Sequence, residues 1–350
     1  MDIPQLTFTR FIAALGIVFF HYYSLHYPFN IPFIQKFVHF SYIFVTYFFL
    51  LSGFILVVSR KTPKINIKSY VYGRIGRIYP VYVFSMLLTI GLLIIKTNHS
   101  TQLDINQLLL EIFMIHAWIP IYAGGAYNYP DWSLSVEIFF YASFPLLLNL
   151  ITNISTPKKI ILAFLVYFAS LFVTNYCLRQ NYSELFIYYF PLLHLSSFMI
   201  GMIGAMIFKK YYTFLLIKKT LIHIASLGAF TVLAIFISTD NPFVLSYSRN
   251  TLLAPFFLLV IYSLALSKGF LTTLFTKTIF IYLGEISYSI YILQCPIMIL
   301  LKDVIGETFN IGNGKIHQLL YLPALLIFSA LTYKYIEVPS RTFFKKLSPT

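Results

Sequence analysis

The sequence has very few charged residues. Only 10% of its 350 residues are Asp, Glu, Lys or Arg, whereas a soluble domain carries about 25%. Hydrophobic residues make up 59% of the chain. A soluble fold of this length could not cover its surface with so few charges. The composition therefore excludes a soluble enzyme, a disordered chain and a nucleic-acid-binding domain, and it indicates an integral membrane protein.

Cysteine is also scarce. The two cysteines, Cys177 and Cys295, lie far apart and show no metal-ligand spacing, so they predict neither a disulfide framework nor a zinc site. The first apolar run is not followed by a small-residue cleavage site, and we expect it to stay in the membrane. No soluble second domain is visible, so we expect one membrane domain over 1–350 and no soluble C-terminal domain.

Long apolar stretches fill most of the chain. A spanning helix needs about 20 mostly apolar residues, and ten stretches meet this length: 8–25, 38–58, 79–95, 133–150, 160–176, 188–208, 220–238, 251–267, 279–300 and 317–336. An eleventh apolar stretch, 107–121, is shorter and contains Glu111, His116 and Pro120.

The basic residues decide the topology, because Lys and Arg concentrate in cytoplasmic loops. If 107–121 does not span and the N-terminus is cytoplasmic, 19 of the 25 Lys and Arg lie inside and 6 outside. If 107–121 spanned, this bias would collapse. We therefore predict an all-α multi-pass protein of the plasma or inner membrane. It has about ten spans, both termini in the cytoplasm, and a re-entrant or interfacial segment near 107–132.

Ionisable residues inside spans are costly and are candidates for function. Arg10 and His21 share one face of the first predicted span, because eleven residues at about 100° each leave a difference of about 20°. Glu137, on the fourth span, has the same predicted depth as His21. A carboxylate beside a histidine orients and stabilises a general base. The alternatives are a snorkelling Arg10 with an interfacial His21, and a helix-start capping pattern of Ser133 with Glu137.

Arg74 and Arg77 enter the third span from the cytoplasm, at the predicted depth of Arg10. Each guanidinium offers a planar fork suited to phosphate. The alternative is ordinary positive-inside charge. Ser52 and Gly53, inside an aromatic span, either let two helices pack closely or open a slot for a thin ligand arm.

Three further polar residues lie within apolar stretches. Glu285, about six residues inside the ninth span, is a candidate partner for an Arg before the third span. His116 and His194 are interpreted as helix–helix hydrogen-bonding groups.

Six motifs in order resemble the acyltransferase-3 family of polysaccharide and lipid O-acyltransferases. They cover nearly the whole chain: Arg10-x10-His21, Phe48–Phe54 (FFLLSGF), Arg74-x-x-Arg77-Ile78-Tyr79-Pro80, Trp132-Ser133-Leu134-Ser135-Val136-Glu137, Leu283–Tyr291 (LGEISYSIY) and Tyr335-Ile336-Glu337-x-Pro339. The family typically has His before the Pro of its ninth-span block, where this chain has Gln294-Cys295-Pro296.

The resemblance implies transfer of an acyl group, most often acetyl, from cytoplasmic acyl-CoA to a hydroxyl of a cell-surface glycan or glycolipid. We expect no metal and no nucleic acid, and we expect membrane lipids and glycan-biosynthesis proteins as partners. His21 would be the base and Glu137 its partner. Direct transfer and an acyl-His intermediate both remain open.

The resemblance also assigns binding roles. The phosphates of acetyl-CoA would be held by Arg10, Arg74 and Arg77. The rest of the donor would contact Ser52, Gly53 and Tyr79, and the acceptor would contact Trp132 and Ser133.

Two other functions compete with this one. A glycolipid transporter or flippase would also have ten spans and intramembrane charges, but it does not explain basic residues at one boundary with His21 and Glu137 at the other. A non-catalytic subunit of a glycan-synthesis complex is the second rival.

Overall fold

The computed structural model describes residues 3–23, 31–60, 65–97, 102–238, 251–306 and 314–347. These ranges are built of helices joined by short turns and contain no strand. The predicted all-α membrane class is therefore confirmed for the part of the chain that is described.

Eight helical stretches of the described residues are long and apolar enough to cross a membrane. They are Gln5–Tyr23, Ile34–Val58, Ile67–Lys96, Tyr129–Thr152, Thr156–Arg179, Glu184–Lys210, Ser287–Ile305 and Leu319–Lys346. Two shorter apolar helices, Lys219–Ile235 and Ala254–Leu266, coincide with the seventh and eighth predicted spans. The chain is thus a multi-pass membrane protein. The count of ten and the cytoplasmic termini stay predictions.

The chain forms two compact units, each made of two separate parts of the sequence. Unit 1 comprises Met1–Pro63 and Phe139–Gly284, and unit 2 comprises Lys64–Ile138 and Glu285–Thr350. The helix α7 (Trp132–Thr152) begins in unit 2 and continues into unit 1.

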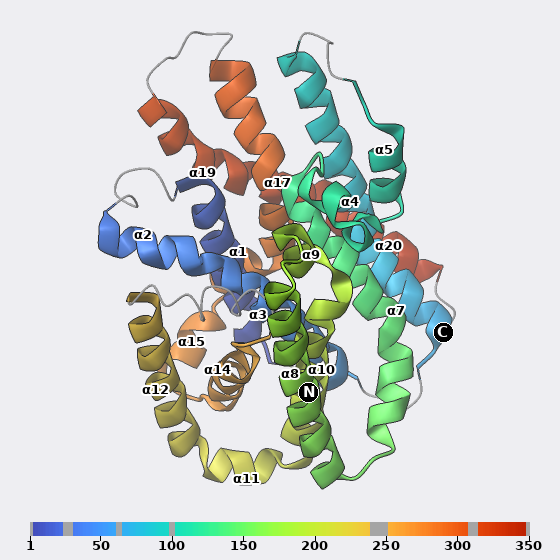
Figure 1. Cartoon of the computed structure of the whole chain (residues 1–350). Helices are drawn as coiled ribbons and strands as arrows, with labels where there is room; N and C mark the ends of the chain where they lie inside the picture. The colour runs from blue at the N-terminus through green and yellow to red at the C-terminus, as the bar shows by residue number, and fades with distance from the viewer. Residues whose placement is uncertain are drawn as a thin grey trace. The chain divides into compact units, whose positions relative to one another are not determined.

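Unit 1 contains most of the helices drawn in blue, green and yellow in Figure 1. They are α1 (Gln5–Val18), η1 (Phe19–Tyr23), α2 (Pro32–His39), η2 (Phe40–Ile43), α3 (Phe44–Val58), α8 (Thr156–Arg179), α9 (Glu184–Tyr189), α10 (Pro191–Lys210), α11 (Tyr212–Ile217), α12 (Lys219–Ser238), α14 (Ala254–Leu266), α15 (Phe270–Phe275) and α16 (Thr278–Glu285).

Helices α3 and α10 approach each other closely in this unit. A Cβ added at Gly53 would lie 2.2 Å from the Phe198 carbonyl oxygen, and one at Gly201 would lie 2.1 Å from the Leu50 carbonyl oxygen. Only residues without a side chain let two backbones come this near.

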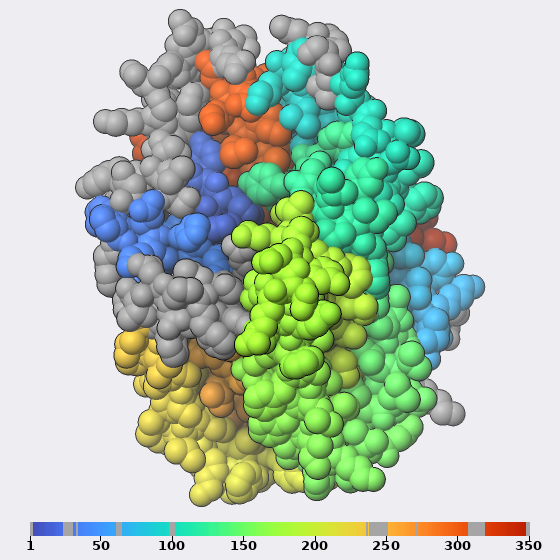
Figure 2. Space-filling view, in the orientation of Figure 1, coloured from blue at the N-terminus to red at the C-terminus, as the bar shows by residue number. Residues whose placement is uncertain are grey.

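Helix α8 has the opposite character. It lies at the surface of unit 1 (Figure 2), where Leu165 is 63% exposed and Phe172 70% exposed. Bulky apolar side chains on an exposed helix face are what a lipid environment requires.

Unit 2 is built around one long helix, α4 (Ile67–Lys96), whose first turn is capped by the Asn66 side chain accepting from Ser69 N. Its other elements are α5 (Ile105–Ile112), η3 (His116–Trp118), α6 (Pro120–Gly124), η4 (Tyr129–Asp131), α17 (Ser287–Ile299), η5 (Leu300–Ile305), α19 (Gly314–Thr332), η6 (Tyr333–Glu337) and α20 (Val338–Lys346). Both α17 and α20 pack on α4.

The segment between α4 and α7 consists of short helical pieces, none of which reaches the length of a span. It is tied to the middle of α4, because Tyr82 Oη donates to the Glu111 carbonyl (2.7 Å) and Tyr79 Oη to the Ile112 carbonyl (3.2 Å). Tyr82 lies fourteen residues before Lys96, the last residue of α4, which is about 20 Å along the axis. This depth favours the re-entrant form of the prediction over a purely interfacial one.

Candidate functional site

The candidate base, His21, lies in a π-helical stretch. Helix α1 changes at Phe19 into η1, a π-helix of five residues that contains His21. The i→i+5 bonding of a π-helix widens the turn, and such stretches are frequent at functional sites. The predicted angle of about 20° between Arg10 and His21 assumed a continuous α-helix. It therefore does not apply to His21, which lies in the π-helical stretch. The half-buried ring lies 5.0 Å from that of Phe20, which also contacts the His39 ring.

Arg10 sits further down α1 and is half-buried. Its guanidinium interacts electrostatically with Tyr47 of α3, whose hydroxyl is hydrogen-bonded to Thr9. Arg10 therefore lies near α3 within unit 1, and its contact with the donor stays a prediction.

Gly53 has a packing role. The space where a side chain would begin is occupied by the backbone of α10. This favours the packing alternative for Gly53, and its contact with the donor stays a prediction. Ser52 is half-buried on the adjacent position of α3, and its contact with the donor stays a prediction.

Arg74 and Arg77 lie in unit 2, one turn apart on α4, and both are half-buried. Arg74 is stacked over the Tyr70 ring at 5.7 Å, which fixes its guanidinium by a cation–π contact. Tyr79 is half-buried and its hydroxyl donates to the Ile112 carbonyl; its contact with the donor stays a prediction.

The start of α7 carries Trp132, Ser133 and Glu137. Trp132 and Ser133 are buried, whereas Glu137 is half-buried. Ser133 Oγ donates to the Pro130 carbonyl (3.1 Å) and lies 2.8 Å from Tyr291 Oη. These bonds fasten the start of α7 to α17.

The candidate residues are divided between the units. Arg10, His21, Ser52 and Gly53 belong to unit 1, and Arg74, Arg77, Tyr79, Trp132, Ser133 and Glu137 belong to unit 2. The pairing of His21 with Glu137 and the grouping of Arg10 with Arg74 and Arg77 stay predictions.

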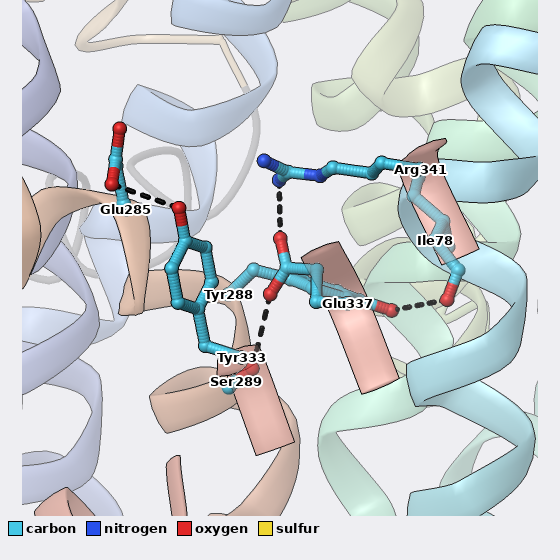
Figure 3. A network of polar contacts seen from close by, with 7 residues as sticks. All are labelled: Ile78, Glu285, Tyr288, Ser289, Tyr333, Glu337 and Arg341. Carbon is cyan, nitrogen blue, oxygen red and sulfur yellow. Dashed lines mark hydrogen bonds and ion pairs between the residues drawn. The ribbon is translucent and has the colours of Figure 1, made fainter. Parts of the chain in front are cut away.

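Sequence reasoning missed a polar network in unit 2 (Figure 3). Glu337 is fully buried, forms an ion pair with Arg341 and accepts from Ser289 Oγ at 3.1 Å. The Glu-to-Arg spacing of four residues was a signal that could have found this pair. Glu285 accepts from Tyr333 Oη at 2.8 Å and also attracts the Arg341 guanidinium electrostatically, whereas its pairing with an arginine before the third span stays a prediction.

A second missed cluster lies in the re-entrant segment. Glu111, His116, Asn128 and Asp131 are all fully buried, and each has at least one side-chain N or O atom without a hydrogen-bond partner. Asn128 Nδ2 ties this segment to the long helices through Ser85 Oγ (3.0 Å) and the Ile292 carbonyl (3.0 Å).

Burial sets the charge of two groups in this cluster. It raises the pKa of Glu111 to about 7, against the opposing hydrogen bonds from Tyr127 N and the Gln107 side chain. It lowers the pKa of His116 to about 4. The carbonyls of Leu110 and Asp131 favour the protonated His116 ring, but neither meets hydrogen-bond geometry. Among the described residues, no three His, Cys, Asp or Glu side chains are placed to hold one metal ion.

A comparison with known families supports the family resemblance of the sequence. A family model described as an acyltransferase domain matches residues 3–334. The chain belongs to the acyltransferase-3 family. Membership of this family supports acyl transfer as the class of reaction.

Relatives of this acyltransferase carry matching names. "Putative acetyltransferase ORF330" of Acidianus two-tailed virus is 25% identical over 307 residues, 87% of this chain and 84% of that protein. "Acyltransferase MdmB" of Streptomyces mycarofaciens is 30% identical over 165 residues, 45% of this chain and 42% of that protein. "Putative O-acetyltransferase SACOL0978" of Staphylococcus aureus is 23% identical over 367 residues, 97% of this chain and 57% of that protein. The chain thus spans little more than half of the staphylococcal relative. No solved structure matches the chain.

One position departs from the acyltransferase-3 pattern. Gln294 stands where the family typically has His, and it is fully buried. Its side-chain Nε2 donates to the Tyr291 carbonyl (2.7 Å), and its backbone carbonyl accepts from Tyr321 Oη (2.9 Å). Gln294 holds α17 and α19 together and has no acid–base capacity, so a histidine's chemistry is not available at this position.

Proposed function

We propose that the protein transfers an acetyl group from acetyl-CoA to a hydroxyl of a glycan or glycolipid at the cell surface. The observation that carries this proposal is the family match over nearly the whole chain. The names of the relatives favour acetyl over other acyl groups. The glycan acceptor is chosen on the family resemblance, and the cytoplasmic donor on the predicted topology.

The reaction needs one base and one stabilised leaving group. The acceptor hydroxyl attacks the thioester carbonyl, the C–S bond breaks, and the CoA thiolate leaves. His21 takes the hydroxyl proton and returns it to the thiolate sulfur, giving an ester and CoA thiol. Glu137 steadies the protonated imidazole. An acyl-His intermediate would balance the same atoms in two steps.

The position of His21 supports this role. A half-buried ring in a π-helical stretch is partly shielded from water, and it is packed against the Phe20 ring. The ring of His39 also contacts Phe20, and His39 offers a matched control, because its removal takes a second histidine away from Phe20 without removing the proposed base.

The test uses purified protein in lipid nanodiscs. We expect the wild-type protein to bind acetyl-CoA and to hydrolyse it slowly. His21→Ala should abolish hydrolysis while acetyl-CoA still binds, Glu137→Gln should slow it, and His39→Gln should leave it unchanged. If the wild-type protein does not bind acetyl-CoA, and acetylation of the cell-surface glycan survives His21→Ala, the proposal is wrong and the transporter hypothesis gains.

A further inference from the structure

We propose that Arg341 binds a phosphate group of the acyl-CoA donor together with Arg77, an assignment that rests on the proposed function. The family motifs quoted above do not include Arg341. Its place in the fold of unit 2 suggests the role.

The packing of α20 on α4 brings the two arginines to one place. A Cβ added at Gly76 would lie 2.7 Å from Phe344 Cβ, so α20 approaches α4 at the residue before Arg77. At the residue after Arg77, the Ile78 carbonyl accepts from Tyr288 Oη at 2.8 Å. Arg77 therefore lies on a part of α4 that is fixed by α20 and α17.

The Arg341 side chain is held in one orientation. Its Nη2 is paired with Glu337 Oε1, one turn earlier in the chain, and Glu337 Oε2 accepts from Ser289. Figure 3 shows the guanidinium extended above Glu337 towards the Glu285–Tyr333 pair. Because Glu337 is fully buried, its ion pair is not replaced by water, and a preorganised guanidinium loses little entropy on binding.

The guanidinium also has donor capacity left over. Arg341 Nε is buried and has no hydrogen-bond partner, although buried polar atoms are normally satisfied. The side chain as a whole is 34% exposed, so a ligand can approach the group from its open side. An anionic oxygen on the open side would accept from the N–H groups that face it, while the buried Nε stays inside the protein.

The local charge favours an anion. Arg77 and Arg341 repel each other electrostatically, and Arg74 lies one turn before Arg77. The two carboxylates nearby are already engaged, Glu337 by Arg341 and Ser289, and Glu285 by the Tyr333 hydroxyl. Three guanidiniums against two carboxylates leave a net positive charge, and guanidinium forks match phosphate geometry in two-pronged hydrogen bonds.

The experiment measures binding of three donors to the full-length protein in nanodiscs of phosphatidylcholine, which carries no net charge. The donors are acetyl-CoA, its 3′-dephospho form and acetyl-pantetheine, which lacks every phosphate. Arg341→Lys keeps the charge and removes the planar fork. We expect it to weaken acetyl-CoA binding at least about tenfold and to leave acetyl-pantetheine binding unchanged. If Arg341→Lys also weakens binding of the 3′-dephospho form, Arg341 binds the diphosphate. If it weakens binding of acetyl-CoA but not of the 3′-dephospho form, Arg341 binds the 3′-phosphate.

Two controls separate binding from folding. Lys345→Ala removes a positive charge one turn further along α20 and should leave every affinity unchanged. Because Arg341→Ala would strand the buried Glu337 charge, the double variant Glu337→Gln, Arg341→Gln is used for complete loss of the group. We expect it to lose acetyl-CoA affinity while its melting temperature stays near that of the wild type.

The outcomes are distinct. If the wild-type protein binds no acetyl-CoA, the proposed function fails. If the wild-type protein binds it and Arg341→Lys does so equally well, only the assignment of Arg341 fails. The assignment also fails if acetyl-pantetheine loses as much affinity as acetyl-CoA. The assignment is overturned, too, if Arg341→Lys differs from the wild type in acetyl-CoA affinity only in phosphatidylglycerol nanodiscs. The phosphate that Arg341 binds would then belong to a lipid headgroup.

Discussion

Gly53 of α3 and Gly201 of α10 lie against the backbone of each other's helix. The hydrogen atom of each occupies a place where a methyl group would meet a carbonyl oxygen at 2.2 Å or less. Close backbone approach of this kind is a main source of helix association in membranes, where apolar side chains gain little by leaving lipid. The crossing therefore sets how α3 presents Ser52.

The first prediction concerns this crossing. Gly53→Ala and Gly201→Ala should each lower stability by about 1–3 kcal/mol, the usual cost of overpacking. Gly228→Ala is the matched control, because nothing lies within 4 Å of its Cβ position on α12, and there alanine should be neutral or favourable by about 0.5–1 kcal/mol. Thermal unfolding in detergent measures all three. A Gly53→Ala protein as stable as the control variant would contradict the packing role.

The second prediction concerns pH. The folded protein holds a proton on Glu111 up to about pH 7, whereas the unfolded chain releases it near 4.5, so this group makes the unfolding free energy fall as pH rises from about 4.5 to 7. His116 acts oppositely. Its folded pKa is about 4 and its unfolded value 6.5, so it makes the unfolding free energy rise from about pH 4 to 6.5.

The two slopes oppose each other between about pH 4.5 and 6.5, and single substitutions should separate them. The melting temperature of Glu111→Gln should rise with pH over this window, and that of His116→Gln should fall. The double variant should return to a slope close to that of the wild-type protein. Identical slopes for the two single variants would show that burial does not control these groups.

The third prediction concerns topology. A cysteine at Gly124 or Gly125, both exposed, should react with a membrane-impermeant thiol reagent added from outside intact cells. Lys158→Cys, on the predicted cytoplasmic side, should react only after permeabilisation. The two native cysteines are buried, so the background should be low. Labelling of the 124–125 region from the cytoplasmic side alone would overturn the predicted topology.

The sequence predicted the helical membrane class and the non-spanning segment well, because apolar length and the distribution of Lys and Arg are local properties. It could not predict that α1 becomes π-helical at Phe19, since this depends on what packs around His21. It left two roles open for Gly53, and only the neighbouring α10 backbone shows that Gly53 lies at a close helix crossing.

The polar network of unit 2 shows a different limit. The spacing of Glu337 and Arg341 was visible in the sequence, but nothing local indicated that Glu337 is fully buried or that Ser289 contacts it. Likewise, nothing local indicated that the Tyr333 hydroxyl donates to Glu285. Such contacts join residues about 50 positions apart in the chain, and only tertiary packing brings them together.

The most direct test of the account is transfer of labelled acetyl from acetyl-CoA. Membranes from cells producing the wild-type protein, His21→Ala or His39→Gln are incubated with radiolabelled acetyl-CoA, and the label in the glycan fraction is counted. We predict equal labelling by the wild-type protein and His39→Gln. For His21→Ala we predict a loss of about a hundredfold or more, the contribution typical of a general base. Labelling by His21→Ala at the wild-type level would contradict the central role given to His21.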